Sequence, residues 1–149
     1  MIDARHGSSN HDRYLLLVDD EPAILTTVSK ALSSWAADHG LQILVATSGE
    51  RALALLEEHG NDVWLLMSDL RMPGMSGMEL LSRAASRYPQ LVRLALTVED
   101  NPAEVSRMVR TGLFGFLPKP WEPEELEAEL TRAYEYARVQ RERARYLRD

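Results

Sequence analysis

The sequence predicts an α/β fold of the doubly wound type, in which a five-stranded parallel sheet carries helices on both faces. Short apolar runs alternate along the chain with stretches whose apolar residues recur at helical spacing. The third run, Val63–Met67, is unbroken, which is typical of a strand buried on both faces of a parallel sheet. Alternation of this kind favours one sheet joined by right-handed crossovers.

Composition is that of a soluble globular protein. The chain has 149 residues, 45% of them hydrophobic and 27% charged, and this length suffices for one domain with its own core. It has no cysteine, which excludes disulfides and thiolate chemistry. The net charge of −6 argues against non-specific nucleic-acid binding. No apolar run approaches a membrane span or a signal peptide, so we expect a cytoplasmic protein that contacts no membrane.

The first strand–helix unit follows a polar stretch, residues 1–12, that we interpret as a flexible leader. Tyr14–Val18 is the first predicted strand. Pro22 then suits the first turn of a helix, and Gly40 ends that helix. Leu41–Ala46 is the second predicted strand.

Two capping boxes, each a hydroxyl residue followed three positions later by Glu, mark the next two helices. Thr47 and Glu50 open the second helix, which runs to about Glu58. Ser76 and Glu79 open the third helix, beyond the Val63–Met67 strand and a loop rich in Pro and Gly.

The last two units follow the same order. Leu91–Leu96 is the fourth strand, and Asn101 and Pro102 are the N-cap and first-turn residues of a helix that ends near Arg110. Leu113–Leu117 is the fifth strand.

The final helix begins at Pro123 and continues nearly to the C-terminus. The a/d spacing of a coiled coil recurs along it at Leu126, Leu130, Ala133, Ala137, Gln140, Ala144 and Leu147, which are apolar except for Gln140. Glutamates crowd its start and arginines its end, which stabilises a helix through its dipole without any partner. Residues 138–149 therefore form a basic extension. It is either a solvated tail or linker, or a helix that forms a homodimer or leads into an output module.

Polar residues follow four of the predicted strands. Asp19 and Asp20 follow the first, Asp69 the third, Thr97 the fourth and Lys119 the fifth. Parallel strands end at one edge of a sheet, so these side chains should converge there. Three adjacent carboxylates repel one another, and one lysine offsets only part of their charge. A divalent cation fits the remainder, and Mg²⁺ is the natural choice for oxygen ligands.

Each of these residues also has a simpler interpretation. Asp19 and Asp20 can cap the first helix, Thr97 can bond to backbone, and Lys119 can be a surface lysine. Lys119 stands between two prolines, however, and the chain has only one other lysine, Lys30. The two prolines restrict the backbone around Lys119, which suits a charge held in a fixed position. Polar residues at the ends of four strands are also more consistent with a site than with four unrelated surface residues.

Four motifs carry a resemblance to a known family: VDDEP at 18–22, SDLRMPGMSG at 68–77, LT at 96–97 and KPW at 119–121. The chain resembles the receiver domain of bacterial two-component response regulators. The resemblance implies a flavodoxin-like (βα)5 fold with its site at the carboxyl edge of the sheet. It places the receiver domain at residues 13–137.

The resemblance also implies residue roles. Asp69 would be the phosphoacceptor, and Mg²⁺ would be bound by Asp20, Asp69 and the backbone carbonyl of Arg71, with Asp19 completing the acidic pair. The phosphoryl donor would be a sensor histidine kinase or a phosphotransfer protein. Such a domain signals to an output domain or partner protein, and its only chemistry is its own phosphotransfer and autodephosphorylation.

The remaining implied roles belong to the fourth and fifth strands. Lys119 would contact the phosphoryl oxygens, and its bond to Pro120 would be cis. Thr97 would be the switch hydroxyl and Phe116 the switch aromatic. Val98 departs from the family pattern, which usually has Ala or Gly there.

Two other functions share features with this pattern. A haloacid-dehalogenase-like phosphatase also uses an Asp nucleophile with Mg²⁺, but in a DxD pattern after the first strand, where this chain has DDE and lacks a substrate-capping insertion. A receiver-like interaction scaffold that is never phosphorylated is the closer alternative. A phosphate-trapping gel shift with a small phosphodonor separates these functions.

Overall fold

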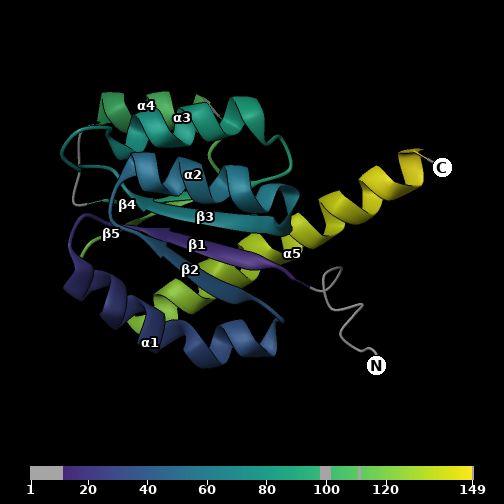
Figure 1. The fold of residues 1–149 in the computed structure, drawn as a ribbon, viewed down its shortest axis with the longest axis horizontal. Helices are drawn as coiled ribbons and strands as arrows, with labels where there is room; N and C mark the ends of the chain where they lie inside the picture. Colours follow the sequence, from purple (N-terminus) through teal and green to yellow (C-terminus); the bar gives the residue numbers. More distant parts are fainter. Residues whose placement is uncertain (1–11, 98–101, 111, 149) are drawn as a thin grey trace.

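The computed structural model describes residues 12–97, 102–110 and 112–148. It confirms the predicted fold, because all five strands pair in parallel in the order β2-β1-β3-β4-β5. Figure 1 shows α2, α3 and α4 on one side of the sheet and α1 and α5 on the other. The leader, apart from Asp12, lies outside the described residues, as do Val98 and the expected N-cap Asn101.

The elements follow the predicted order closely. The strands are β1 (Tyr14–Val18), β2 (Gln42–Ala46), β3 (Val63–Asp69), β4 (Val92–Thr97) and β5 (Gly115–Pro118). The helices are α1 (Pro22–Asp38), α2 (Gly49–His59), α3 (Gly77–Arg87), α4 (Pro102–Arg110) and α5 (Pro123–Arg148), with a short 3-10 helix, η2, at Gly60–Asp62. None of the helices in the described ranges combines the length and apolarity that a membrane span requires.

The core consists of two apolar layers, one on each side of the sheet. The alternation of side chains along β1 supplies both, with Leu16 facing α2 and α3 and Leu15 and Leu17 facing α1 and α5. Strands β1 and β3 lie in the middle of the sheet and are covered on both sides. A double-sided core fixes the backbone of these strands, and therefore fixes the positions of the residues that end them.

The helix caps were predicted correctly for α3 and incorrectly for α2. Ser76 accepts a hydrogen bond from the backbone N–H of Glu79 at 3.1 Å, as expected. At α2 the capping residue is Ser48, which accepts from the N–H of Arg51 at 3.0 Å, and Thr47 has no such role. The helix begins one residue later than the Thr47–Glu50 pattern indicated. The hydroxyl at the N-cap position is therefore that of Ser48.

In the first half of α5, the a/d residues pack on the sheet and do not form a coiled-coil seam. Leu126, Leu130, Ala133 and Ala137 are fully buried against the sheet, in the layer shared with α1. These positions are not available to a partner helix. Only Gln140, Ala144 and Leu147 remain outside that layer, and Leu147 is exposed.

Candidate functional site

The carboxylate-bearing ends of β1 and β3 lie side by side because the two strands are neighbours in the sheet. Asp19 directly follows β1 and is only 2% exposed. Its Oδ1 accepts a hydrogen bond of 2.9 Å from the N–H of Glu21, at the start of α1. Burial and this bond hold the Asp19 carboxylate in place.

Asp69 is the last residue of β3 and pairs with Leu96 of β4. The strand is two residues longer than the predicted apolar run, so Asp69 belongs to the sheet itself. Gly77 begins α3 directly against this strand end: its N–H donates to the Leu70 carbonyl at 3.0 Å. A Cβ on Gly77 would collide with the carbonyl of Asp69, so this close approach of helix to strand requires glycine.

Lys119 brings the fifth strand into the site. Its Nζ lies 3.4 Å from Oδ2 of Asp19 and 3.5 Å from Oδ2 of Asp69, so one ammonium group bridges two carboxylates. The backbone N–H of Lys119 donates to the Thr97 carbonyl at 2.7 Å, which ties the residue to the end of β4. The Lys119–Pro120 peptide bond is cis, as the resemblance implied.

The acidic group is suited to a divalent cation. Asp19, Asp20 and Asp69 each offer a carboxylate oxygen, and the three oxygens lie within 4.8 Å of one another. The ammonium group of Lys119 contacts Asp19 and Asp69, and it supplies one positive charge against the three negative charges of the group. Hard oxygen ligands and an unbalanced negative charge match the preferences of Mg²⁺.

Burial raises the pKa of Asp69 above its ordinary value, and the charge of Asp19 raises it further. Lys119 and the N–H of Arg71, which bonds Oδ1 at 3.4 Å, act in the opposite direction. The folded pKa lies above the unfolded value of 3.8. The folded state therefore favours the protonated carboxyl over the ionised carboxylate. The stabilisation that this preference gives the metal-free fold is complete below pH 3.8 and is lost as the pH rises through the folded pKa.

We therefore expect Asp69→Asn to stabilise the metal-free protein at pH 7 by about 1 kcal/mol, or roughly 3 °C in Tm. The gain should shrink as the pH falls toward 4, because the wild-type carboxyl then becomes neutral. Thermal unfolding in the presence of a chelator measures both effects. Glu142→Gln, which changes an exposed acid within α5 and away from the helix ends, is the control and should leave Tm nearly unchanged. A lower Tm for Asp69→Asn at pH 7 would contradict this assignment of the charge.

The two expected switch residues are placed differently. Thr97 is buried at the end of β4, next to the strand end that carries Asp69. Phe116, on β5 opposite Ala95, is 36% exposed and does not reach the acidic group. The structure thus brings Asp19, Asp20, Asp69 and Lys119 together and leaves the aromatic outside.

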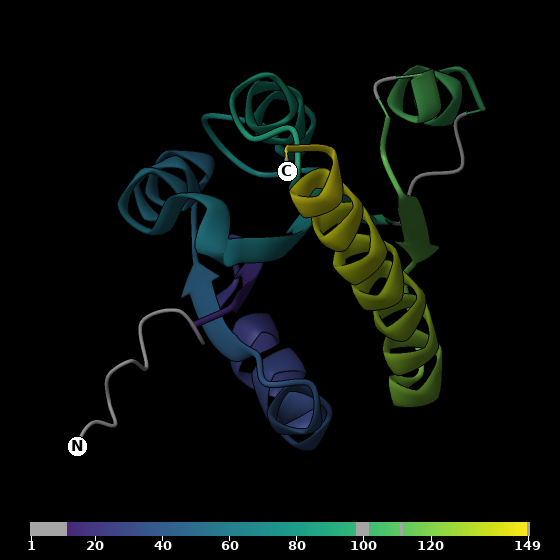
Figure 2. The same cartoon turned by 90° about the vertical axis from the view of Figure 1, so that its right-hand side faces the viewer.

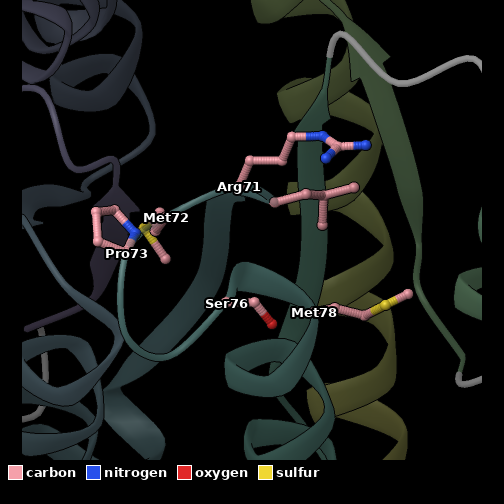
Figure 3. Close-up of a pocket in the computed structure, with 6 residues that line it drawn as sticks. Arg71, Met72, Pro73, Ser76 and Met78 are labelled. Carbon is pink, nitrogen blue, oxygen red and sulfur yellow. The ribbon is translucent and has the colours of Figure 1, made fainter.

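Two cavities lie near the site, one lined by residues that directly follow Asp69 and the other by Lys119. One, of about 490 Å³, is lined by the loop after β3 and the start of α3, where Arg71, Met72, Pro73, Ser76 and Met78 lie (Figure 3). The other, of about 370 Å³, lies beside Lys119 and is lined also by Ile24, Pro120 and Trp121. Ile24 has the spacing of a core residue, so sequence reasoning missed its place here. The KPW motif was the only available signal for this apolar wall.

Residues 15–131 match the family model of the response regulator receiver domain. The chain therefore belongs to this family of signalling domains. Solved structures support the same conclusion. The crystal structure of the signal receiver domain of an HD domain-containing protein from Pseudomonas fluorescens Pf-5 superposes with a TM-score of 0.77 at 29% identity, covering 86% of this chain and 98% of that one.

Curated relatives include longer proteins. The DNA-binding transcriptional regulator NtrC of Salmonella typhimurium is 32% identical over 126 residues, which are 85% of this chain and 26% of that protein. The sensor kinase CckA of Brucella abortus is 33% identical over 112 residues, or 75% of this chain and 11% of that protein. The chain thus spans about a quarter or less of the length of these two relatives.

Proposed function

We propose that this receiver domain accepts a phosphoryl group on Asp69 and changes conformation in response. One observation carries the proposal: the carboxylate of Asp69, at the end of the central strand, lies close to two further carboxylates and to the ammonium group of Lys119. A carboxylate is a weak nucleophile, so the reaction depends on placement and on offsetting the charge of the phosphoryl oxygens. Membership of the receiver family supports the same role.

The chemistry follows from the arrangement of the side chains. An oxygen of Asp69 forms a bond to phosphorus while the bond from phosphorus to the donor breaks, and the departing donor group takes up a proton. Lys119 offsets negative charge on the phosphoryl oxygens. Asp19, Asp20, Asp69 and the carbonyl of Arg71 would hold Mg²⁺, which supplies a further positive charge to those oxygens when bound.

The donor would be a phosphohistidine of a sensor histidine kinase or of a phosphotransfer protein. The apolar cavity formed by Ile24, Pro120 and Trp121 supports this, because it lies directly beside Lys119. An apolar surface next to the reacting group gives a partner protein a place to dock while its histidine reaches Asp69. The response would pass to an output domain or partner protein, and residues 138–149 would serve as its linker or pairing helix.

Phosphorylation would act through the ends of β4 and β5. The phosphoryl group adds roughly 1.5 to 2 negative charges at one point. The hydroxyl of Thr97 would move toward it, and Phe116 would turn from its exposed position toward the space that Thr97 vacates. A local change of charge would thereby alter the surface of α4 and β5.

Metal binding tests the acidic group directly. We expect Asp20→Ala to weaken Mg²⁺ affinity by at least about tenfold, because affinity for this ion depends on the number of charged ligands. Calorimetric titration of the unphosphorylated protein measures it. Glu21→Ala removes an exposed acid from the next position and should have little effect. An Asp20→Ala protein that retained wild-type affinity would show that the ion is held elsewhere.

The scaffold alternative predicts a different result in a phosphate-trapping gel. A scaffold should show no shifted band after treatment with acetyl phosphate and Mg²⁺. A phosphoacceptor should show one. The four clustered side chains favour the phosphoacceptor, because binding alone does not require a buried carboxylate bridged by lysine.

A further inference from the structure

A cluster of aromatic and guanidinium groups lies at the amino ends of the central strands, opposite the carboxyl ends where the acidic site lies. Trp64, near the start of β3, is its centre. The guanidinium of Arg13, just before β1, lies 4.8 Å from the centre of the indole, and that of Arg141, on α5, lies 4.7 Å from it. The ring of Tyr134 stacks on Trp64 at 5.6 Å. Residues from both ends of the domain therefore meet on one side chain.

Arg141 is bound to the backbone as well as to the indole. Its Nη1 donates to the carbonyl of Asn61 at 2.7 Å, and its Nη2 donates to the carbonyl of Val63 at 3.3 Å. Its Nε is buried without a hydrogen-bond partner. A planar guanidinium can bond two separate carbonyls and stack on a ring at the same time, which an ammonium group cannot do.

The charge of Arg141 persists despite its surroundings. Burial lowers its pKa to about 10, with Arg13 acting in the same direction and Asp62 opposing it. The group is therefore protonated at neutral pH, and its hydrogen bonds are charge-assisted. Arg13 is itself held in place, because its Nη1 donates to the hydroxyl of Tyr134 at 2.9 Å.

Other arginines of the extension are arranged differently. Arg138 bonds to Glu135 on its own helix at 3.0 Å, and Arg143 and Arg145 are exposed. Ala137 is the last residue of α5 that is buried in the core. About 16 Å of helix follow it. Figure 1 shows this part of α5 continuing past the end of the sheet, and in Figure 2 the same end of α5 lies in front of the sheet. Without a further attachment, the helix could pivot at that point.

We propose that Arg141 clamps α5 to the start of β3, so that the basic extension leaves the domain as a rigid arm with one direction. The clamp joins the extension to the strand whose other end carries Asp69. It goes beyond the proposed function and does not depend on phosphorylation. Trp64 and Val63 belong to β3, and Asn61 lies in the short η2 helix directly before it, so the clamp fixes the arm to the start of the central strand.

Distance measurements between spin labels test the clamp in the full chain. The protein has no cysteine, so two cysteines can be introduced freely, by Ala54→Cys on α2 and Arg145→Cys on the extension. Both positions are exposed. We expect a narrow distance distribution in the otherwise wild-type chain and a distribution at least roughly twice as wide after Arg141→Ala, because two charge-assisted bonds are lost.

The matched control is Arg143→Ala, which removes an exposed arginine two positions away and should leave the distribution narrow. Arg141→Lys keeps the charge but cannot reproduce the forked geometry, and should give an intermediate width. This variant also decides the matter if Arg141→Ala fails to fold. A distribution as narrow in Arg141→Ala as in wild type would overturn the proposal. If Arg141→Ala does not fold, a wild-type width for Arg141→Lys would do the same.

Discussion

Replacing Asp69 by Asn is expected to abolish phosphorylation of the chain by acetyl phosphate. The neutral amide leaves the shape of the site intact but removes the nucleophilic oxygen, so labelling should fall by roughly a thousandfold or more. Asp19 and Asp20 should not substitute for it. Asp19 is almost completely buried and bonded to the N–H of Glu21, and neither residue lies at the end of the central strand.

Intact-mass measurement after incubation with acetyl phosphate and Mg²⁺ checks this expectation. The wild-type protein should gain one phosphoryl group, and the Asp69→Asn protein should gain none. Asp38→Asn, which alters an exposed acid outside the site, should label as the wild type does. Labelling of Asp69→Asn at the wild-type level would mean that another residue is the phosphoacceptor.

Loss of Lys119 should be the next largest effect. Lys119→Ala should slow phosphorylation by about a hundredfold or more, because the one ammonium group seen to contact both Asp19 and Asp69 is then missing. Lys119 also lowers the pKa of Asp69, so its removal raises that pKa further and reduces the fraction of ionised nucleophile.

The chain offers a close control for this experiment. Lys30 is the only other lysine and is exposed on α1, so Lys30→Ala should phosphorylate at the wild-type rate. Lys119→Arg should be only partly active, since a guanidinium keeps the charge but not the compact shape of an ammonium group. If Lys119→Ala were phosphorylated at the wild-type rate, Lys119 would have no role in the reaction.

The parts of the structure that the sequence predicted well have local signals. The buried run Val63–Met67 needed no knowledge of its neighbours to be recognised as a strand. Ser76 and Glu79 mark the start of α3 within four residues. The convergence of the acidic group followed from one rule, that parallel strands end at the same edge of a sheet.

Other features depend on packing that spacing alone does not encode. The a/d pattern from Leu126 to Ala137 fits both a coiled coil and a helix lying on a sheet, and only the sheet resolves this choice. The contact of Arg13 and Arg141 with Trp64 joins three distant parts of the chain. No local pattern distinguishes Arg141 from the other arginines around it.

Locating the phosphoryl group tests the central claim most directly. Borohydride reduction converts an aspartyl phosphate to homoserine, and peptide mass spectrometry then identifies the residue that carried the group. After phosphorylation of the wild-type chain with Mg²⁺ present, we expect homoserine at position 69 and at no other aspartate. Conversion at Asp19 or Asp20 instead, or phosphorylation that proceeds equally well in a chelator, would contradict it.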